Sequence, residues 1–142
     1  MMIKQYALGL GIVLVSACAH FQNPETSLYD QIGGKAAITQ ITDNFIRQIE
    51  FDREIFPYFA ESNVDRFREK FEEHLCVQVN GPCEYTGDDM LAVHKGMNIT
   101  EADFNRTVDL LINAMTDANV PHRLQNRILA KLAPMRSEMI YK

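Results

Sequence analysis

The sequence predicts an all-α fold. Its 142 residues include no tryptophan, few alternating β-branched runs and long intervals between glycines, and apolar residues recur at the three- and four-residue spacing of a helix face. The length fits one domain, and an apolar fraction of 46% is enough for a buried core. The net charge of −5, with dispersed lysines and arginines, lacks the basic footprint of a nucleic-acid binder. We therefore expect no nucleic-acid partner.

The first residues resemble an export signal. Lys4 supplies a positive start, and the apolar run from Tyr6 to Val15 is too short to cross a bilayer. The run is followed by Ser16-Ala17-Cys18, which resembles a lipobox, in which small residues precede a cysteine. We expect residues 1–17 to be a lipoprotein signal peptide and Cys18 to carry the lipid.

Residues 18–26 then form a lipidated tether, and residues 27–142 form the folded domain. Ala19, rather than Asp, matches the outer-membrane sorting pattern of Gram-negative bacteria, which predicts a lipid anchor in that membrane, facing the periplasm. The alternative is an ordinary signal peptide, cut after Ala17 or Ala19, with a free Cys18.

Caps and apolar stripes place the helices of the first half. Ser27 is expected to cap a short helix that ends at Gly33-Gly34. A long helix follows from Lys35 and is closed by Asp52 and Pro57, and Ser62 or Asn63 caps the next. The stripes of these two long helices are Ile38, Ile41, Phe45 and Ile49, then Val64, Phe67, Phe71 and Leu75. The second stops at Asn80-Gly81-Pro82.

The second half of the sequence is expected to form one short and two long helices. One or two helical turns lie between Gly87 and Gly96. Thr100 and Asp103 approximate a capping box that opens a long helix. Pro121 fits the first position of the last helix, which Pro134 should bend.

His94 is the main candidate functional residue. It lies in a short apolar run with Met90, Leu91 and Val93 before it and Met97 after it. A histidine in such a run has one nitrogen free to point into an apolar cavity while the other bonds to the backbone, as an axial haem ligand does. A packed histidine with a backbone partner is the alternative.

The order of features resembles a group 1 truncated haemoglobin, a small globin with a two-over-two helical sandwich. The resemblance covers Ser27 to about Met139. It rests on the opening Ser27-Leu28-Tyr29-Asp30-Gln31-Ile32-Gly33-Gly34, the aromatic pair Tyr58-Phe59, the Gly81-Pro82 turn, Tyr85-Thr86-Gly87, Met90 and His94.

The resemblance implies a haem b cofactor with His94 as the proximal iron ligand and diatomic gases (O2, NO, CO) as ligands. Positions that would contact the haem are Phe45, Ile46, Phe59, Phe67, Phe71, Leu75, Met90, Ile99, Phe104, Val108 and Ile128. For each wall residue, simple core packing is the alternative.

Three positions depart from the family pattern. Ile46 stands where many members have a tyrosine that hydrogen-bonds the gas ligand, and Phe67 and Phe71 stand where polar groups such as glutamine often occur. Asn80 replaces the first glycine of a loop pair, which asparagine tolerates. A hydrogen bond to a charged group is worth roughly 1.5–3 kcal/mol, so we expect weaker oxygen binding than in tyrosine-bearing relatives. Binding of NO and CO should be relatively preserved.

His74, Cys76 and Cys83 are further candidates. His74 follows Phe67 by seven residues, so it returns to nearly the same helix face and could bond a propionate, reach a gas ligand or coordinate iron as a distal ligand. A rim histidine in water is the alternative. Cys76 and Cys83 could form a disulfide in an oxidising compartment, or remain two buried thiols.

Functions other than gas binding are also compatible with these residues. A haem redox or electron-transfer protein is one, and an NO-detoxifying protein that uses an external reductase is another. A zinc-binding module could be built from His74, Cys76, Cys83 and His94, although these lack a Cys-x-x-Cys knuckle. A haem-free adaptor is a further alternative. We see no nucleophile–base pair typical of a hydrolytic enzyme.

Overall fold

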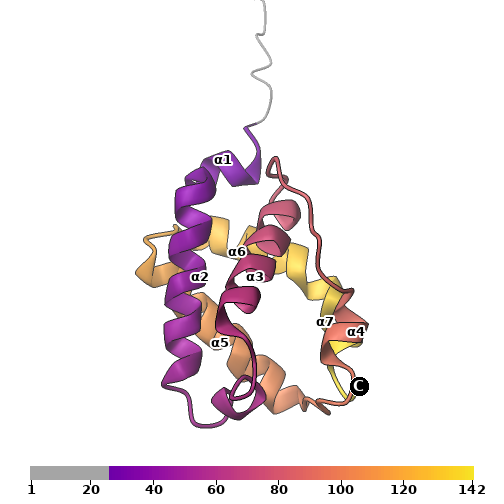
Figure 1. Ribbon diagram of the computed structural model, residues 1–142. Helices are drawn as coiled ribbons and strands as arrows, with labels where there is room; N and C mark the ends of the chain where they lie inside the picture. The colour runs from indigo at the N-terminus through magenta and orange to yellow at the C-terminus, as the bar shows by residue number, and fades with distance from the viewer. Residues whose placement is uncertain (1–25) are drawn as a thin grey trace, which may run out of the picture.

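The computed structural model describes residues 26–142, which form seven α-helices and two short 3₁₀ helices with no β-strand in this range (Figure 1). The all-helical prediction is confirmed. Cys18 and the predicted signal peptide lie outside the described residues. Within residues 26–142, no helix has the length and apolar character needed to span a membrane.

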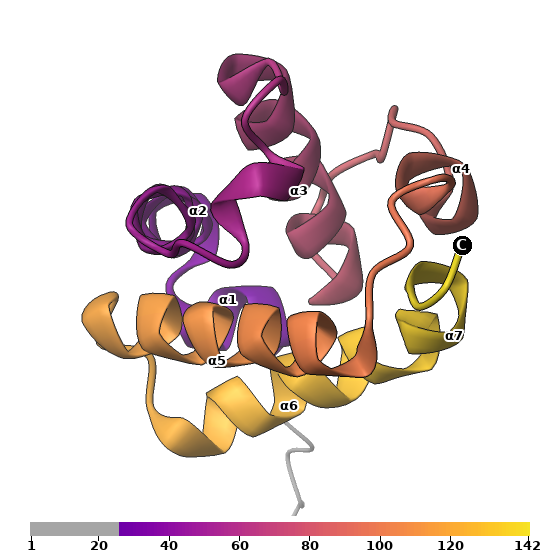
Figure 2. The same ribbon diagram turned by 90° about the horizontal axis from the view of Figure 1, so that it is seen from below.

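Four helices form two crossed layers. The first layer holds α2 (Gly34–Glu50) and α3 (Val64–Gln78), and the second holds α5 (Glu101–Asp117) and α6 (His122–Leu132). Figure 2 shows α5 and α6 lying lengthwise under α2 and α3. Helix α2 packs against both α3 and α5, so it connects the layers.

The helix starts follow the caps read from the sequence. Ser27 caps α1 (Leu28–Ile32) by accepting the N–H of Asp30, and Asn63 caps α3 by accepting the N–H of Arg66. Thr100 and Asp103 form the full capping box of α5. Each cap satisfies backbone N–H groups that have no partner inside the helix.

Two turns use left-handed backbone, as expected. Gly33 ends α1 with φ of 108°, and Asn80 follows α3 with φ of 61°. The short helices that follow are η1 (Phe56–Tyr58) in the aromatic segment and α4 (Met90–His94) between loops.

The last helix is interrupted rather than bent. Helix α6 ends at Leu132, η2 covers Ala133–Met135, and α7 covers Arg136–Met139. Pro134 cannot donate the next helical hydrogen bond and its ring crowds the preceding turn, so the chain leaves the α-helical path there. Pro121 is the N-cap of α6 rather than its first residue. The interruption brings α7 beside α4 (Figures 1 and 2).

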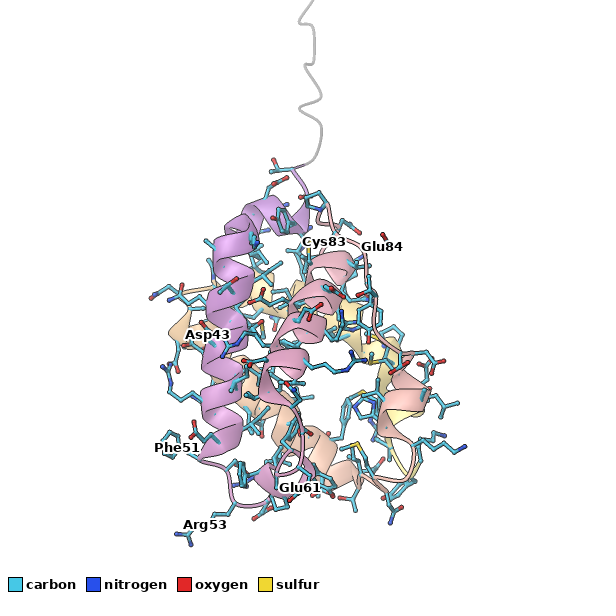
Figure 3. The ribbon with its side chains drawn as sticks, in the orientation of Figure 1. Asp43, Phe51, Arg53, Glu61, Cys83 and Glu84 are labelled. Atoms are coloured by element: carbon cyan, nitrogen blue, oxygen red, sulfur yellow. A yellow bond between two sulfur atoms is a disulfide. The ribbon has the colours of Figure 1, made fainter. Side chains whose placement is uncertain are left out.

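The core lies between the two layers. Ile41 of α2, Met115 of α5 and Ile128 of α6 are completely buried there. The buried amide of Asn44 donates to the Ala114 carbonyl at 3.2 Å, which adds a polar tie between α2 and α5. A surface contact also joins α2 to α3, where Arg68 of α3 forms an ion pair with Asp43, which is labelled on α2 in Figure 3.

Candidate functional site: a cavity lined by His94

A large cavity lies beside the two-layer core. Its volume is about 940 Å³, and side chains from all the helices except α1, together with the segments between them, form its walls. Helices α3 and α4 both contribute to its lining, and the ribbons of these two helices stand apart from each other in Figures 1 and 2. The lining is mainly apolar, with a few polar side chains, as in sites that bury a flat organic cofactor.

His94 is at the end of α4 and lines the cavity. Asp89 caps this helix by accepting the N–H of Ala92 at 2.8 Å. The Nδ1 atom of the half-buried His94 ring lies 2.7 Å from the carbonyl oxygen of Met90. Because a carbonyl only accepts, Nδ1 donates this bond, so in the neutral tautomer the lone pair is on Nε2.

Four phenylalanines form a connected wall on the side of α2 and α3. Phe45 lies 5.0 Å from Phe71 between ring centroids, Phe71 lies 5.6 Å from Phe67, and Phe67 lies 5.0 Å edge-to-face from Phe59. These separations are typical of favourable aromatic pairs. The wall therefore has no hydrogen-bond donor or acceptor among its side chains.

Polar side chains occupy the edge of the same α3 face. Arg66, Lys70 and His74 follow one another at four-residue spacing and all line the cavity. Lys70 Nζ donates to the Thr86 hydroxyl at 2.6 Å, and its pKa is raised by hydrogen bonds to Glu69 and Glu73. The α3 edge is thereby connected to the loop that leads to α4.

His74 is half-buried in this edge. Its ring packs edge-to-face against Tyr85, with 5.3 Å between centroids. Burial lowers the pKa of the imidazole, because removal from water destabilises the charged form more than the neutral form. His74 is thus neutral at neutral pH and does not sit in open water.

The side of the cavity that holds His94 is rich in sulfur, and a polar contact between Tyr58 and Asp103 also lies in the lining. The methionines that line it are Met90, Met97, Met135 and Met139. The Tyr58 hydroxyl donates to the Asp103 carboxylate at 2.8 Å and raises the pKa of Tyr58. This bond connects the end of η1 to the start of α5.

Most of the residues expected around a cofactor meet in this one cavity. Beside His94 and His74, those that line it are Phe45, Phe59, Phe67, Phe71, Met90, Ile99, Phe104 and Val108.

Three residues expected in the wall lie outside the cavity. Ile46 is half-buried but follows Phe45, so the 100° turn per residue of α2 points it elsewhere. Leu75 and Ile128 are 1% and 0% exposed and belong to the core between the layers. Both lie on the apolar stripes of their helices, but at these positions the stripes face the core.

Several lining residues were not expected from the sequence. They are Tyr58, Arg66, Lys70, Tyr85, Met97, Met135 and Met139. The four-residue spacing of Arg66, Lys70 and His74 beside Phe67 and Phe71 was a usable signal, because it places all five on adjoining stripes of one helix. The methionines carry no such signal, since their place depends on the interruption at Pro134.

Cys76 and Cys83 form a disulfide with 6.0 Å between their Cα atoms. It joins the end of α3 to the loop before α4, near the label of Cys83 in Figure 3. Both sulfurs are used, so the zinc alternative loses its two thiolates. Among residues 26–142, no group of three or more His, Cys, Asp or Glu side chains could hold a metal ion.

Comparison with known proteins identifies the family. Residues 27–141 match the bacterial-like globin family. A group 1 truncated haemoglobin of Mycolicibacterium paratuberculosis is 34% identical over 85% of this chain and 90% of its own length. The chain is a truncated haemoglobin. A group 1 truncated haemoglobin from a Nostoc species is 28% identical over 82% of this chain.

Solved truncated haemoglobins share the fold. The structure of the truncated haemoglobin from Tetrahymena pyriformis superimposes with a TM-score of 0.79 at 22% identity, and the match covers 82% of this chain and all of that one. A group II truncated haemoglobin from Bacillus anthracis gives a TM-score of 0.76 at 21% identity, covering 84% and 95%. The predicted two-over-two helical sandwich is confirmed.

Membership of this family implies a haem cofactor, and the cavity fits one. It is large and mainly apolar, as the porphyrin face requires, and it has charged side chains at its edge, as the propionates require. Two half-buried imidazoles, His94 and His74, line the cavity, and an imidazole nitrogen is the donor that globin iron uses.

Proposed function

We propose that this truncated haemoglobin binds haem b through His94 and reversibly binds the diatomic gases O2, NO and CO. The observation that carries the proposal is the His94 ring, which lines the large apolar cavity and has its Nδ1 fixed by the Met90 carbonyl at 2.7 Å. Haem iron held by one imidazole supplies an open coordination position at which small gases bind.

The protein groups around His94 prepare the ring for that role. The Met90 carbonyl selects the tautomer with the proton on Nδ1 and makes Nε2 a better electron donor. The cap at Asp89 holds the start of α4, so the ring is positioned by the same short helix that supplies its hydrogen-bond partner. The methionines beside it provide polarisable apolar contacts and exclude water.

The aromatic wall predicts the order of gas preference. Phe45, Phe67 and Phe71 offer no donor to a polarised gas ligand. The missing hydrogen bond is worth roughly 1.5–3 kcal/mol, or about one to two decades in affinity. We expect rapid oxygen release, with CO and NO binding less affected because they depend less on a polar partner.

A second function, electron transfer, is favoured by His74. This imidazole lines the same cavity, is neutral because burial lowers its pKa, and comes from the α3 side. A distal histidine ligand would fill the gas position and suit electron transfer or sensing. NO detoxification would further need an external reductase.

The site is tested by optical spectra of the haem-loaded chain, ferric and ferrous. We expect His94→Gly to lose the wild-type spectrum and added imidazole to restore it. His122→Gly is the matched control, since His122 is exposed at the start of α6 and outside the cavity. A wild-type spectrum that His94→Gly leaves unchanged would refute the proposal.

His74→Ala separates the two functions. A five-coordinate ferrous spectrum that this variant leaves unchanged supports gas binding at an open position. A six-coordinate spectrum that becomes five-coordinate in His74→Ala supports electron transfer or sensing.

The role of the aromatic wall is tested by measuring oxygen release by stopped flow. Phe71→Gln introduces an amide donor on the cavity face of α3, whereas Phe71→Leu changes the volume without adding a donor. We expect release at least about tenfold slower in the glutamine variant, from the hydrogen-bond energy above. Equal rates in the two variants would show that polarity at this position does not limit oxygen binding.

We also propose that the protein is lipid-anchored in a Gram-negative cell envelope. The support is the small-residue run before Cys18 in the sequence. Metabolic labelling with a fatty-acid analogue should mark the wild-type chain and not Cys18→Ala. Equal labelling of both would refute the anchor.

A further inference from the structure

Helix α4 has little that holds it in place on its own. It contains five residues, none of them buried, and two of its apolar side chains, Leu91 and Val93, are nearly half exposed. A helix this short is not stable in isolation, because its few hydrogen bonds do not offset the cost of nucleation. The position of His94 must therefore depend on what contacts the two ends of α4.

The segment after His94 is bonded to the last residues of the described chain. The main-chain oxygen of Lys142 accepts the N–H of Gly96 and the N–H of Asn98, each at 3.0 Å. The N–H of Tyr141 donates to the carbonyl of Ile99 at 2.9 Å. Residues 140–142, which we call the C-terminal clamp, thus make three backbone hydrogen bonds to residues 96–99.

The clamp is also anchored by packing. Ile99 and Ile140 pair as an isolated parallel bridge, and these two residues are 9% and 8% exposed. Helix α7, which precedes the clamp, contacts α4 directly. Figures 1 and 2 both show the C-terminal end of the ribbon beside α4.

The clamp includes one residue in a backbone conformation that it does not adopt freely. Tyr141 has φ of 55°, in the left-handed region that a bulky residue with a Cβ disfavours. Gly96, with φ of 84°, and Asn98, with φ of 50°, are residue types that adopt this region at little cost. Conformations of this kind persist where surrounding contacts hold them. Here the contacts are the clamp's hydrogen bonds, made between segments about 45 residues apart.

We propose that the C-terminal clamp is a positioning element for His94. It fixes residues 96–99 immediately after the ring, and so sets the direction from which Nε2 meets the iron and how readily α4 moves away from the haem. This inference rests on the proposed role of His94 as the iron ligand. The clamp acts through the backbone, so the Lys142 main-chain oxygen matters and the Lys142 side chain does not.

The test compares the haem-loaded wild-type chain with three variants. Deletion of Lys142 removes the oxygen that accepts two N–H groups, and because this residue is exposed, the fold survives its loss. Deletion of residues 140–142 removes the whole clamp. Lys142→Ala keeps the oxygen and is the matched control. The measurements are the iron–histidine stretching band of the ferrous protein and the rate of haem transfer to excess apomyoglobin.

We expect deletion of Lys142 to shift or broaden the iron–histidine band and to speed haem loss at least threefold. Deletion of residues 140–142 should speed it at least tenfold, and Lys142→Ala should match the wild type. An unchanged band, with haem loss within twofold of wild type after deletion of Lys142, overturns the clamp. Equal effects of the deletion and of Lys142→Ala overturn it as well, because the side chain would then be responsible.

The outcomes also separate the clamp from the proposed function. A wild-type chain whose haem spectrum does not depend on His94 refutes the proposed function and the clamp's role with it. A His94-dependent wild-type spectrum that both deletions leave unchanged refutes the clamp alone. Amide hydrogen exchange of residues 90–99 adds a readout that needs no haem: in the haem-free chain it should rise in both deletions and stay unchanged in Lys142→Ala.

Discussion

The disulfide between Cys76 and Cys83 gives a prediction whose size follows from the structure. Cys83→Ser is the suitable change, because Cys83 is exposed and a serine hydroxyl there enters water. The Cys76 thiol, 3% exposed, then stays as a small buried apolar group. The sequence separation is 7 residues, and the chain-entropy relation gives a stabilisation of about 2.4 kcal/mol for so short a loop.

The assay is urea unfolding of the wild type and of Cys83→Ser, each with and without a thiol reductant. We expect the free energy of unfolding to fall by about 2.4 kcal/mol in the variant, which corresponds to roughly 10 °C in Tm for a domain of this size. Reductant should lower the wild type to the level of the variant and leave the variant unchanged. A difference below about 0.5 kcal/mol would refute the reasoning. The disulfide would then not restrict the conformational freedom of the unfolded chain as the chain-entropy relation requires.

The disulfide between Cys76 and Cys83 also affects the loop that leads to the cavity. Gly81 lies inside the disulfide loop, and a Cβ placed there would come within 2.5 Å of Cys76 Sγ and 2.6 Å of a Tyr29 ring carbon. The loop is therefore tightly packed against α1 and the end of α3. Because it leads to α4, we expect Cys83→Ser to lose haem faster than the wild type even where both are fully folded.

Three further predictions concern single residues. Asp52 accepts from Arg106 Nε at 2.8 Å, and this bond, followed by those from the backbone of the next turn, lowers its pKa. Its stabilisation is therefore complete above the unfolded pKa of about 4 and is lost as pH falls through the lower folded pKa. Asp52→Asn should cost about 2 kcal/mol at pH 7 and flatten the acid side of the stability curve, as followed by circular dichroism. Thr42 is fully buried, and its hydroxyl is the one buried side-chain polar atom without a partner among the described residues, so Thr42→Val should raise the free energy of unfolding by about 1 kcal/mol. Tyr58→Phe removes the 2.8 Å bond to Asp103 and should cost about 1–2 kcal/mol in urea unfolding, whereas no change would mean that water replaces that bond.

The helices were predictable because their signals are local. Ser27, Asn63 and Thr100 each accept a hydrogen bond from the backbone N–H three residues ahead. Four consecutive residues are therefore enough to determine each cap. The end of α3 at Asn80-Gly81 is also determined by nearby residues, because a residue with left-handed backbone ends a helix whatever the position of the rest of the chain. The interruption at Pro134 was foreseen as a bend, but its extent depends on α7 finding contacts with α4.

Membership of the cavity wall was less predictable, because an apolar stripe does not say which apolar space it faces. Phe71 and Leu75 share a stripe on α3, yet Phe71 lines the cavity and Leu75 belongs to the core between the layers. The two volumes meet along α3, and one turn of the helix decides between them. Glu73 shows the converse: its position predicts a solvated side chain, but its carboxylate accepts the N–H of Thr86 at 2.9 Å and so helps to hold the loop before α4.

These contacts explain why the sequence identifies His94 but not its orientation. The apolar run around it marks the residue, while the contacts that set its place come from distant segments. Glu73 and Cys76 of α3 hold the loop before α4, and the Lys142 oxygen holds the segment after it. A five-residue helix fixed at both ends moves only if one of these attachments gives way. The two ends should therefore affect haem retention additively, and a combined Cys83→Ser and Lys142 deletion should speed haem loss by the product of the two single effects. An effect well below that product would mean that both attachments limit one and the same opening motion.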